Sequence, residues 1–264
     1  MLEIKNISKT FNAGTINEKK ALKEVSLTLD DGDFVTVIGG NGAGKSTLLN
    51  AICGTWQVDE GEIIIDGKDV THTPEHKRAK YLGRVFQDPM MGTAADMEIQ
   101  ENLALAKRRG KARGLDWGIS KKEREEYREL LASLGLGLEN RMTTKVGLLS
   151  GGQRQAVTLL MAAMAEPKLL LLDEHTAALD PKTAEKVLEI TEDIVNKTHL
   201  TTLMITHNMR DAIKHGNRLI MMHEGRIIVD VSGEKKKNLT VDDLLNLFNQ
   251  ASGKEFSSDR AMLS

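Results

Sequence analysis

The sequence is poor in several residue types, and each shortage excludes a class of structure or function. A single cysteine, Cys53, excludes an internal disulfide and is typical of a reducing compartment. Aromatic residues make up only 3% of the chain, which argues against a platform that stacks the bases of single-stranded nucleic acid. The formal net charge of −2 supplies no basic field for DNA or RNA, so we expect no nucleic-acid partner.

Long apolar runs are also missing. The apolar run at residues 157–165 is much shorter than the roughly 18 residues of a membrane-spanning helix. The opening residues, MLEIKNISKT, lack the apolar stretch of a secretory signal. Whatever the chain does at a membrane, we therefore expect it to act from the surface.

The first third of the sequence predicts short strands. They lie at residues 2–7, 25–29, 34–38 and 61–65, separated by polar or glycine-containing turns. The run 34–38 is almost wholly apolar, as in a strand that is buried on both faces of a sheet. Asp66 and Gly67 follow the last run and predict a hairpin.

The pattern then changes twice. Residues 88–149 show helical spacing and many charges, and we interpret them as an inserted helical subdomain. Apolar runs at 169–172, 202–205 and 218–222 alternate with helical stretches, which predicts parallel strands joined by helical crossovers. We expect one domain over residues 1–264, with its core at 1–87 and 150–231 and a helical tail at 232–264. In the tail, Thr240 and Asp243 predict a capped amphipathic helix.

Residues 39–46, GGNGAGKS, match the pattern G-x-x-x-x-G-K-[ST] between a predicted strand and a predicted helix. Glycines let the backbone turn its N–H groups toward phosphate oxygens, and the helix that begins near Lys45 adds its positive dipole end. Lys45 would contact the β- and γ-phosphates of ATP, and the Ser46 hydroxyl would ligate Mg²⁺. The other candidates for ATP contact here are Gly39, Asn41, Gly42, Ala43, Gly44 and Thr47.

Two acidic residues end the apolar run 169–172. A buried strand of a parallel sheet delivers the residues at its C-terminal end to the edge where the phosphate loop lies, so we expect Asp173 and Glu174 beside that loop. The Asp173 carboxylate suits Mg²⁺, directly or through water. Glu174 suits the general base that orients or deprotonates the attacking water. Together these residues predict a Mg²⁺-dependent ATPase.

The sequence also resembles the ATP-binding-cassette (ABC) family. Residues 149–153, LSGGQ, match the family's signature, and they precede Asp173 and Glu174 as the signature does in that family. The other family motifs follow in the same order along roughly residues 1 to 230: Phe11, the loop 39–46, Gln87, the segment 178–180 and His207. The resemblance implies an α/β fold with a P-loop NTPase core of mostly parallel strands, an antiparallel β edge and an inserted helical subdomain.

The resemblance also implies roles for single residues. Phe11 would stack on adenine, although its type alone also fits a core position. Gln87 would contact Mg²⁺ or the attacking water, and His207 would donate to the γ-phosphate. Either residue taken alone fits an ordinary surface or structural position. The ATP-binding set is completed by Ser150, Gly151, Gly152, Gln153 and Asp180.

One chain thus carries two phosphate-binding elements but only one ATP loop. In the family, each ATP lies between the loop of one chain and the signature of the other, so the resemblance predicts a homodimer with an isologous interface. The sequence departs from the commonest family pattern at several positions, and the helix after the signature, residues 154–165, lacks the arginine often seen in its second turn. His175 follows Glu174 at a position where proline is usual. Ala177 precedes the segment 178–180, and in the family a serine is frequently found near this position. None of these departures touches a group that handles phosphate, so together they indicate a divergent subgroup.

Residues 88–98 combine methionines with small side chains, which suits an adaptable docking groove. In ABC transporters this region accepts a coupling helix of the permease. Residues 11–22 and 90–105 resemble bacterial subunits that work with branched-chain-amino-acid-like permeases and an extracytoplasmic solute-binding protein. We therefore expect a peripheral subunit on the cytoplasmic face of the cell membrane that drives uptake of a small solute, an amino acid being one candidate.

Two alternatives remain open from the sequence. An exporter subunit would carry the same motifs. A non-transport ABC ATPase that acts on ribosomes or DNA is disfavoured, because this chain has one cassette and no long heptad insert.

Overall fold

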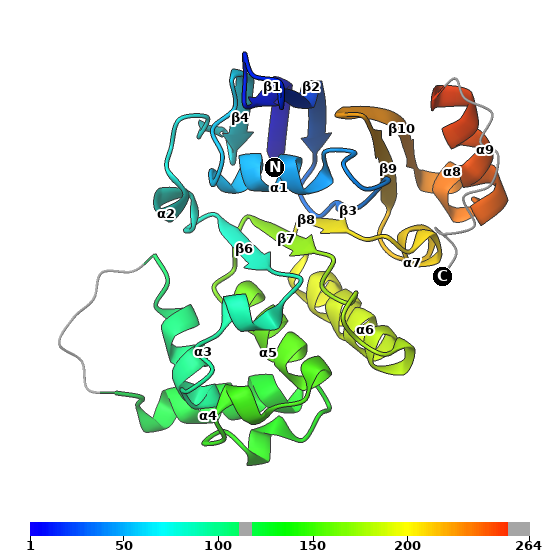
Figure 1. Ribbon diagram of the computed structural model, residues 1–264. Coiled ribbons are helices and arrows are strands. Elements are labelled where there is room, and N and C mark those ends of the chain that lie inside the picture. The colour runs from blue at the N-terminus through cyan, green and yellow to red at the C-terminus, as the bar shows by residue number, and fades with distance from the viewer. Residues whose placement is uncertain (111–117, 253–264) are drawn as a thin grey trace.

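The computed structural model describes residues 1–110 and 118–252. In this part of the chain, an antiparallel sheet in the order β2-β1-β4-β5 lies beside a mostly parallel sheet in the order β10-β9-β3-β8-β7-β6 (Figure 1). The arrangement confirms the predicted fold class, although the antiparallel strands form a sheet of their own. Residues 253–264 of the predicted tail lie outside the described residues.

The antiparallel sheet is longer than the sequence indicated. Its strands are β1 (Leu2–Phe11), β2 (Lys19–Leu29), β4 (Glu60–Ile65) and β5 (Lys68–Asp69). The hairpin at Asp66 and Gly67 is confirmed, and both residues have positive φ angles, 53° and 70°. The prediction that β2 begins at residue 25 was wrong. Irregularities in the pairing of β1 with β2 break the apolar alternation there, so the first half of β2 does not show a strand pattern.

The parallel sheet forms the centre of the molecule. Its strands are β3 (Phe34–Ile38), β6 (Leu82–Val85), β7 (Leu169–Asp173), β8 (Thr202–Ile205), β9 (Arg218–His223) and β10 (Arg226–Ser232), of which only β10 is antiparallel to its neighbour. In β7, Leu169 and Leu171 pack into the core below the antiparallel sheet, whereas Leu170 and Leu172 face the helical layer. Burial on both faces explains the unbroken apolar runs of the sequence.

Helices cover the parallel sheet and extend away from it (Figure 1). They are α1 (Lys45–Cys53), α2 (Glu75–Arg78), α3 (Ile99–Lys107), α4 (Lys121–Ala132), α5 (Gly151–Ala163), α6 (Pro181–Thr198), α7 (Met209–Lys214), α8 (Gly233–Lys237) and α9 (Val241–Ser252). Short 3₁₀ turns span Pro89–Gly92, Leu138–Asn140 and Val146–Leu148. Among the residues that the structure describes, no helix combines the length and the apolar composition needed to cross a membrane.

The helical layer between β6 and α5 is held by local caps and a shared core. The side chains of Ser120 and Glu123 form a capping box at the start of α4. Tyr127 and Leu131 of α4 then pack with Leu103 of α3 in a core that also contains α5 and α6 residues. Near the C-terminal end of the described chain, the predicted cap of α9 is confirmed: Thr240 Oγ1 accepts a hydrogen bond from the Asp243 N–H at 3.2 Å, and an Asp243 carboxylate oxygen accepts from the Thr240 N–H at 3.0 Å.

Candidate functional site

The loop between β3 and α1 bends sharply and packs closely against neighbouring backbone. Gly39, Gly42 and Gly44 have positive φ angles of 153°, 78° and 105°. A Cβ atom on Gly39 would lie 2.3 Å from the carbonyl oxygen of Met222, and one on Gly44 would lie 2.7 Å from that of Ala21. Only glycine therefore fits at these two positions without displacing the backbone of a neighbouring strand or loop.

Lys45, the first residue of α1, is buried with 5% of its surface exposed. Its Nζ donates hydrogen bonds to the carbonyl oxygens of Gly39, at 2.8 Å, and of Gly40, at 3.3 Å. Burial lowers the pKa of this amine, and the nearby carboxylates of Glu174 and Asp173 oppose the shift. The amine is thus fixed beside the N-terminus of α1, where the helix dipole also favours an anion.

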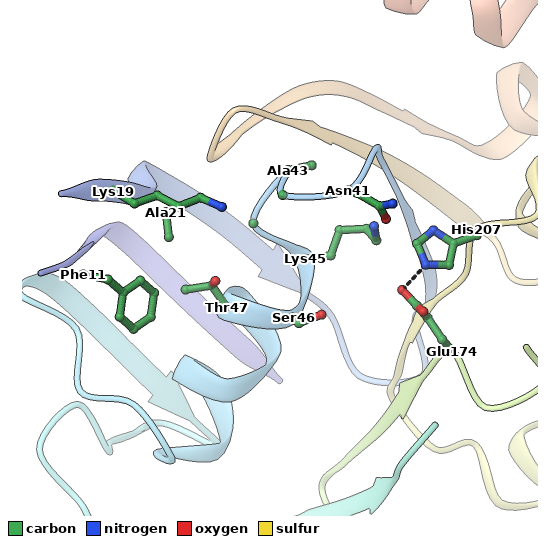
Figure 2. A pocket seen from close by; sticks show the side chains of 12 residues that line it. Phe11, Lys19, Ala21, Asn41, Ala43, Lys45, Ser46, Thr47, Glu174 and His207 are labelled. Carbon is green, nitrogen blue, oxygen red and sulfur yellow. Dashed lines mark ion pairs between the residues drawn. The ribbon is translucent and has the colours of Figure 1, made fainter. Parts of the chain in front are cut away.

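An open pocket lies against this loop (Figure 2). Three groups of residues from distant parts of the chain line it: Phe11, Lys19 and Ala21 from the antiparallel sheet, residues 41–47 from the loop and α1, and Glu174 and His207 from beyond the ends of β7 and β8. An aromatic ring thus stands at one end of the pocket and an acid–imidazole pair at the other. ATP has a matching division, with an adenine base at one end and an anionic triphosphate at the other.

Glu174 and His207 meet because β7 and β8 are parallel neighbours, whose C-terminal ends reach the same edge of the sheet. Glu174 Oε1 lies 2.7 Å from His207 Nε2 (Figure 2). The Glu174 side chain is 11% exposed, against 47% for His207. The sequence pointed to each residue separately, and the sheet brings the two side chains into contact inside the pocket.

Of the predicted site residues, Gly39, Asp173 and Gln87 lie outside the pocket wall. Asp173 ends β7 beside Arg84, whose Nη2 is 3.5 Å from its Oδ2. Burial raises the pKa of Asp173. The Arg84 guanidinium acts to lower this pKa, and the negative charge of Glu174 raises it further. Gln87 is exposed and follows β6 by two residues. Arg84, which the sequence did not single out, is therefore the charged partner of the candidate metal ligand.

The signature residues and Asp180 also lie outside the pocket wall. Ser150 caps α5, since its hydroxyl accepts a hydrogen bond from the Gln153 N–H at 3.3 Å. Asp180 caps α6 in the same way, from the Thr183 N–H at 3.1 Å. A Cβ on Gly152 would lie 2.1 Å from Thr183 Cγ2, so the starts of the two helices pack closely. Within one chain, the signature therefore forms a separate surface.

Phe11 is half-buried at the mouth of the pocket rather than in the core. Its ring contacts that of Trp56 edge-on, with centroids 4.9 Å apart and an interplanar angle of 78°. Lys9 Nζ lies over the ring, 5.8 Å from its centroid, and the ring lines the pocket.

Sequence reasoning missed Lys19 in the pocket wall. In the pairing of β1 with β2, Lys19 stands opposite Phe11, and Figure 2 shows its side chain directed toward the loop. A Cβ built on Gly42 would lie 3.4 Å from Lys19 Nζ. The available signal was the lysine pair at 19–20, which begins β2, but the strand predicted from the sequence started at residue 25 and did not include it.

The fold and the site define a P-loop nucleotide-binding domain. Comparison with known proteins narrows this class. The family model described as "ABC transporter" matches residues 22–177. A "Tyrosine transport ATP-binding protein" of Clostridioides difficile (strain R20291) is 45% identical over 251 residues, which is 95% of this chain and 100% of that protein. A sulfate/thiosulfate import ATP-binding protein of a Synechocystis species is 37% identical over 229 residues, covering 85% of this chain and 58% of that protein.

A solved structure also indicates an ATP-binding cassette. The chain is similar to a dimeric ATP-binding cassette in a post-hydrolysis state bound to ADP and Pi, with a TM-score of 0.75 and 31% identity over 88% of this chain and 98% of that one. The chain belongs to the ABC transporter family and is an ATP-binding subunit, in which ATP hydrolysis is coupled to transport. The predicted likeness to subunits of branched-chain-amino-acid-like permeases is not confirmed by these relatives.

Proposed function

We propose that this chain hydrolyses ATP with Mg²⁺ to drive uptake of a small solute through separate permease subunits. The observation that carries the proposal is the shared pocket of Lys45 with Glu174 and His207. Lys45 contacts the β- and γ-phosphates, and Glu174 accepts a proton from the attacking water. Without nucleotide, His207 Nε2 holds the Glu174 carboxylate through their 2.7 Å contact; with ATP bound, the same N–H would turn to the γ-phosphate.

The Mg²⁺ ion fits the oxygen donors near the loop. The described part of the chain has no group of three or more His, Cys, Asp or Glu side chains able to hold a metal. An ion that arrives with ATP needs fewer protein ligands, because phosphate oxygens and water occupy most of its positions. The Ser46 hydroxyl in the pocket wall and the Asp173 carboxylate suit this role, with the Gln87 amide as a further donor. Bound there, Mg²⁺ would offset charge on the phosphates.

The second half of each site comes from a second copy of the chain. Ser150, Gly151, Gly152 and Gln153 start α5 away from the chain's own pocket, and Asp180 starts α6 beside them. A hydroxyl and free N–H groups at a helix start favour an anion. In a symmetric homodimer these groups of one protomer face the γ-phosphate held by its partner, so two ATP molecules lie in the interface. The dimeric cassette to which this chain is similar supports this arrangement.

The transport role rests on the relatives. Similar proteins named for tyrosine transport and sulfate/thiosulfate import favour uptake, and the former favours an amino acid. We place the subunit at the cytoplasmic face of the cell membrane, bound to permeases and working with an extracytoplasmic solute-binding protein. The core at 1–87 and 150–231 would bind ATP, and the helical subdomain at 88–149 would dock the permease. Met90 and Met91, 40% and 70% exposed, offer it an apolar surface.

Transport assays test this proposal. Cells that lack this chain should lose uptake of one solute, and the wild-type chain should restore it while Lys45→Ala should not. Radiolabelled amino acids, tyrosine first, followed by sulfate, are the substrates to measure. Membrane vesicles from the cells that carry the wild-type chain should show ATP hydrolysis that stops when EDTA removes Mg²⁺. Loss of efflux in place of uptake would establish an exporter, and unchanged transport of all solutes would contradict the transport role.

Lys19 should strengthen nucleotide binding through the phosphates. Lys19→Ala is expected to raise the Kd of ATP and of ADP by about tenfold, since a charge-assisted contact of roughly 1.4 kcal/mol is lost. Lys20→Ala is the matched control, because Lys20 is the next residue of β2 and does not line the pocket. Titration calorimetry of both variants measures the effect. Equal affinities for the two variants would show that Lys19 is only a solvated surface residue.

A further inference from the structure

The backbone of Glu174 adopts a conformation that an ordinary residue avoids. Its φ angle is +48°, in the left-handed region. Residues held in this region need support from their surroundings, and they cluster at functional sites. Two backbone hydrogen bonds supply part of the support: the Glu174 N–H donates to the Ile205 carbonyl oxygen at 3.0 Å, and the Glu174 carbonyl oxygen accepts from the Ala177 N–H at 3.0 Å.

The next residue, His175, turns its side chain away from the pocket and into the protein. It is 2% exposed. Its Nε2 lies 3.1 Å from Thr191 Oγ1 on α6, and Thr191 is also fully buried. The side chain thus ties the turn after β7 to a long helix that is packed on the parallel sheet.

The direction of this hydrogen bond follows from the chemistry of the hydroxyl. Thr191 Oγ1 donates its one proton to the Val187 carbonyl oxygen at 2.8 Å. It can therefore only accept from the imidazole, so His175 carries its proton on Nε2. Burial lowers the pKa of His175 to about 4, with a smaller contribution from His215, so the ring is neutral near pH 7. The contact is a fixed bond between neutral groups over the physiological range.

We propose that His175 is a positioning residue for Glu174. The hydrogen bond from His175 to Thr191 holds the turn that directs the Glu174 carboxylate into the pocket. The proposal rests on the proposed role of Glu174 as the base. A simple core-filling role does not account for the imidazole, because an apolar side chain would fill the same space without needing a buried partner. Without a donor at this position, the buried Thr191 oxygen would lose the partner of its lone pair, and the turn would lose its side-chain anchor.

The test compares two replacements of His175. His175→Gln keeps an N–H donor near the position of Nε2, whereas His175→Met keeps the volume without the donor. We expect His175→Met to lower kcat for ATP hydrolysis by about tenfold, a loss of roughly 1.4 kcal/mol of transition-state stabilisation, with KM for ATP unchanged. His175→Gln should retain most of the wild-type kcat.

Variants of α6 provide the matched control. Thr191→Val removes the acceptor and should lower kcat as His175→Met does, and the double variant should be no worse than either. Thr198 makes the same kind of bond to the carbonyl oxygen four residues earlier, at 2.7 Å, but it is exposed, and the structure shows no hydrogen bond from it to the neighbouring His199 ring. Thr198→Val should therefore leave kcat unchanged.

Three results would overturn the inference: a wild-type kcat in His175→Met, an equal loss in His175→Gln, or a loss that follows the melting temperature across all variants. ATP binding, measured by titration calorimetry, should be the same in the wild type and His175→Met. Failure of the inference is distinct from failure of the proposed function. In the first case the wild type hydrolyses ATP and the His175 variants behave alike, whereas in the second the wild type itself has no ATPase activity.

Discussion

Glu174→Gln is expected to bind ATP with wild-type affinity and to hydrolyse it about 10²- to 10⁴-fold more slowly, because the general base is lost. The amide keeps an oxygen that can accept from His207, so the 2.7 Å contact and the turn around it should survive. Since the binding groups of the loop are untouched, the loss should fall on kcat rather than on the affinity for ATP.

The same variant should reveal the shared site. With hydrolysis blocked, the γ-phosphate stays between Lys45 of one protomer and Ser150 of its partner, and bound ATP favours the dimer by mass action. Sedimentation velocity should show a monomer without nucleotide and a dimer with ATP. A monomer at saturating ATP would contradict the shared-site arrangement, and hydrolysis at the wild-type rate would show that Glu174 is not the base.

Adding Ser150→Arg to Glu174→Gln supplies the control for this dimer. A bulky side chain in place of the hydroxyl should block the approach of the phosphate, so the ATP-dependent dimer should disappear while each chain still binds ATP. The change also removes the cap of α5, at a cost of about 1 kcal/mol, and thermal melting must show that the fold persists. An ATP-dependent dimer that survives the change would place the signature outside the interface.

Lys45→Ala should sharply lower the rate of ATP hydrolysis and weaken ATP binding. The amine is fixed under the loop by the carbonyl oxygens of Gly39 and Gly40, in position to meet developing negative charge. Loss of one such preorganised donor lowers kcat on the order of 10²- to 10³-fold. Steady-state ATPase assays and calorimetric titration with ATP measure the two effects.

Lys236 is the matched control for Lys45. It is a second buried lysine, 2% exposed, and its Nζ likewise donates to two carbonyl oxygens, those of His215 and Gly216. It does not line the pocket. Lys236→Ala should therefore destabilise the fold while leaving kcat unchanged at temperatures below its melting transition. Near-normal hydrolysis by Lys45→Ala would refute the assignment of the phosphate loop.

Much of the site was predictable because its chemistry is carried by contiguous residues. The phosphate loop needs glycine at Gly39 and Gly44 for reasons of local backbone geometry and close approach, and those needs appear directly as a spaced motif. Glu174 was equally accessible, since an apolar strand ending in two acids predicts where a parallel sheet delivers them. The β3 and β8 bounds were correct for the same reason: a strand buried on both faces is an unbroken apolar run.

The sequence by itself therefore determined the family, the loop and the acidic strand end, all of which depend on short-range order along the chain. The tertiary structure alone decided which distant side chains share the pocket. Irregular pairing of β1 with β2 places Lys19 opposite Phe11. The neighbouring ends of β7 and β8 bring the side chain of His207 into contact with that of Glu174. It also turned His175 inward onto Thr191. Such contacts join segments far apart in the chain, and local periodicity carries no information about them because they form only when sheets and helices pack.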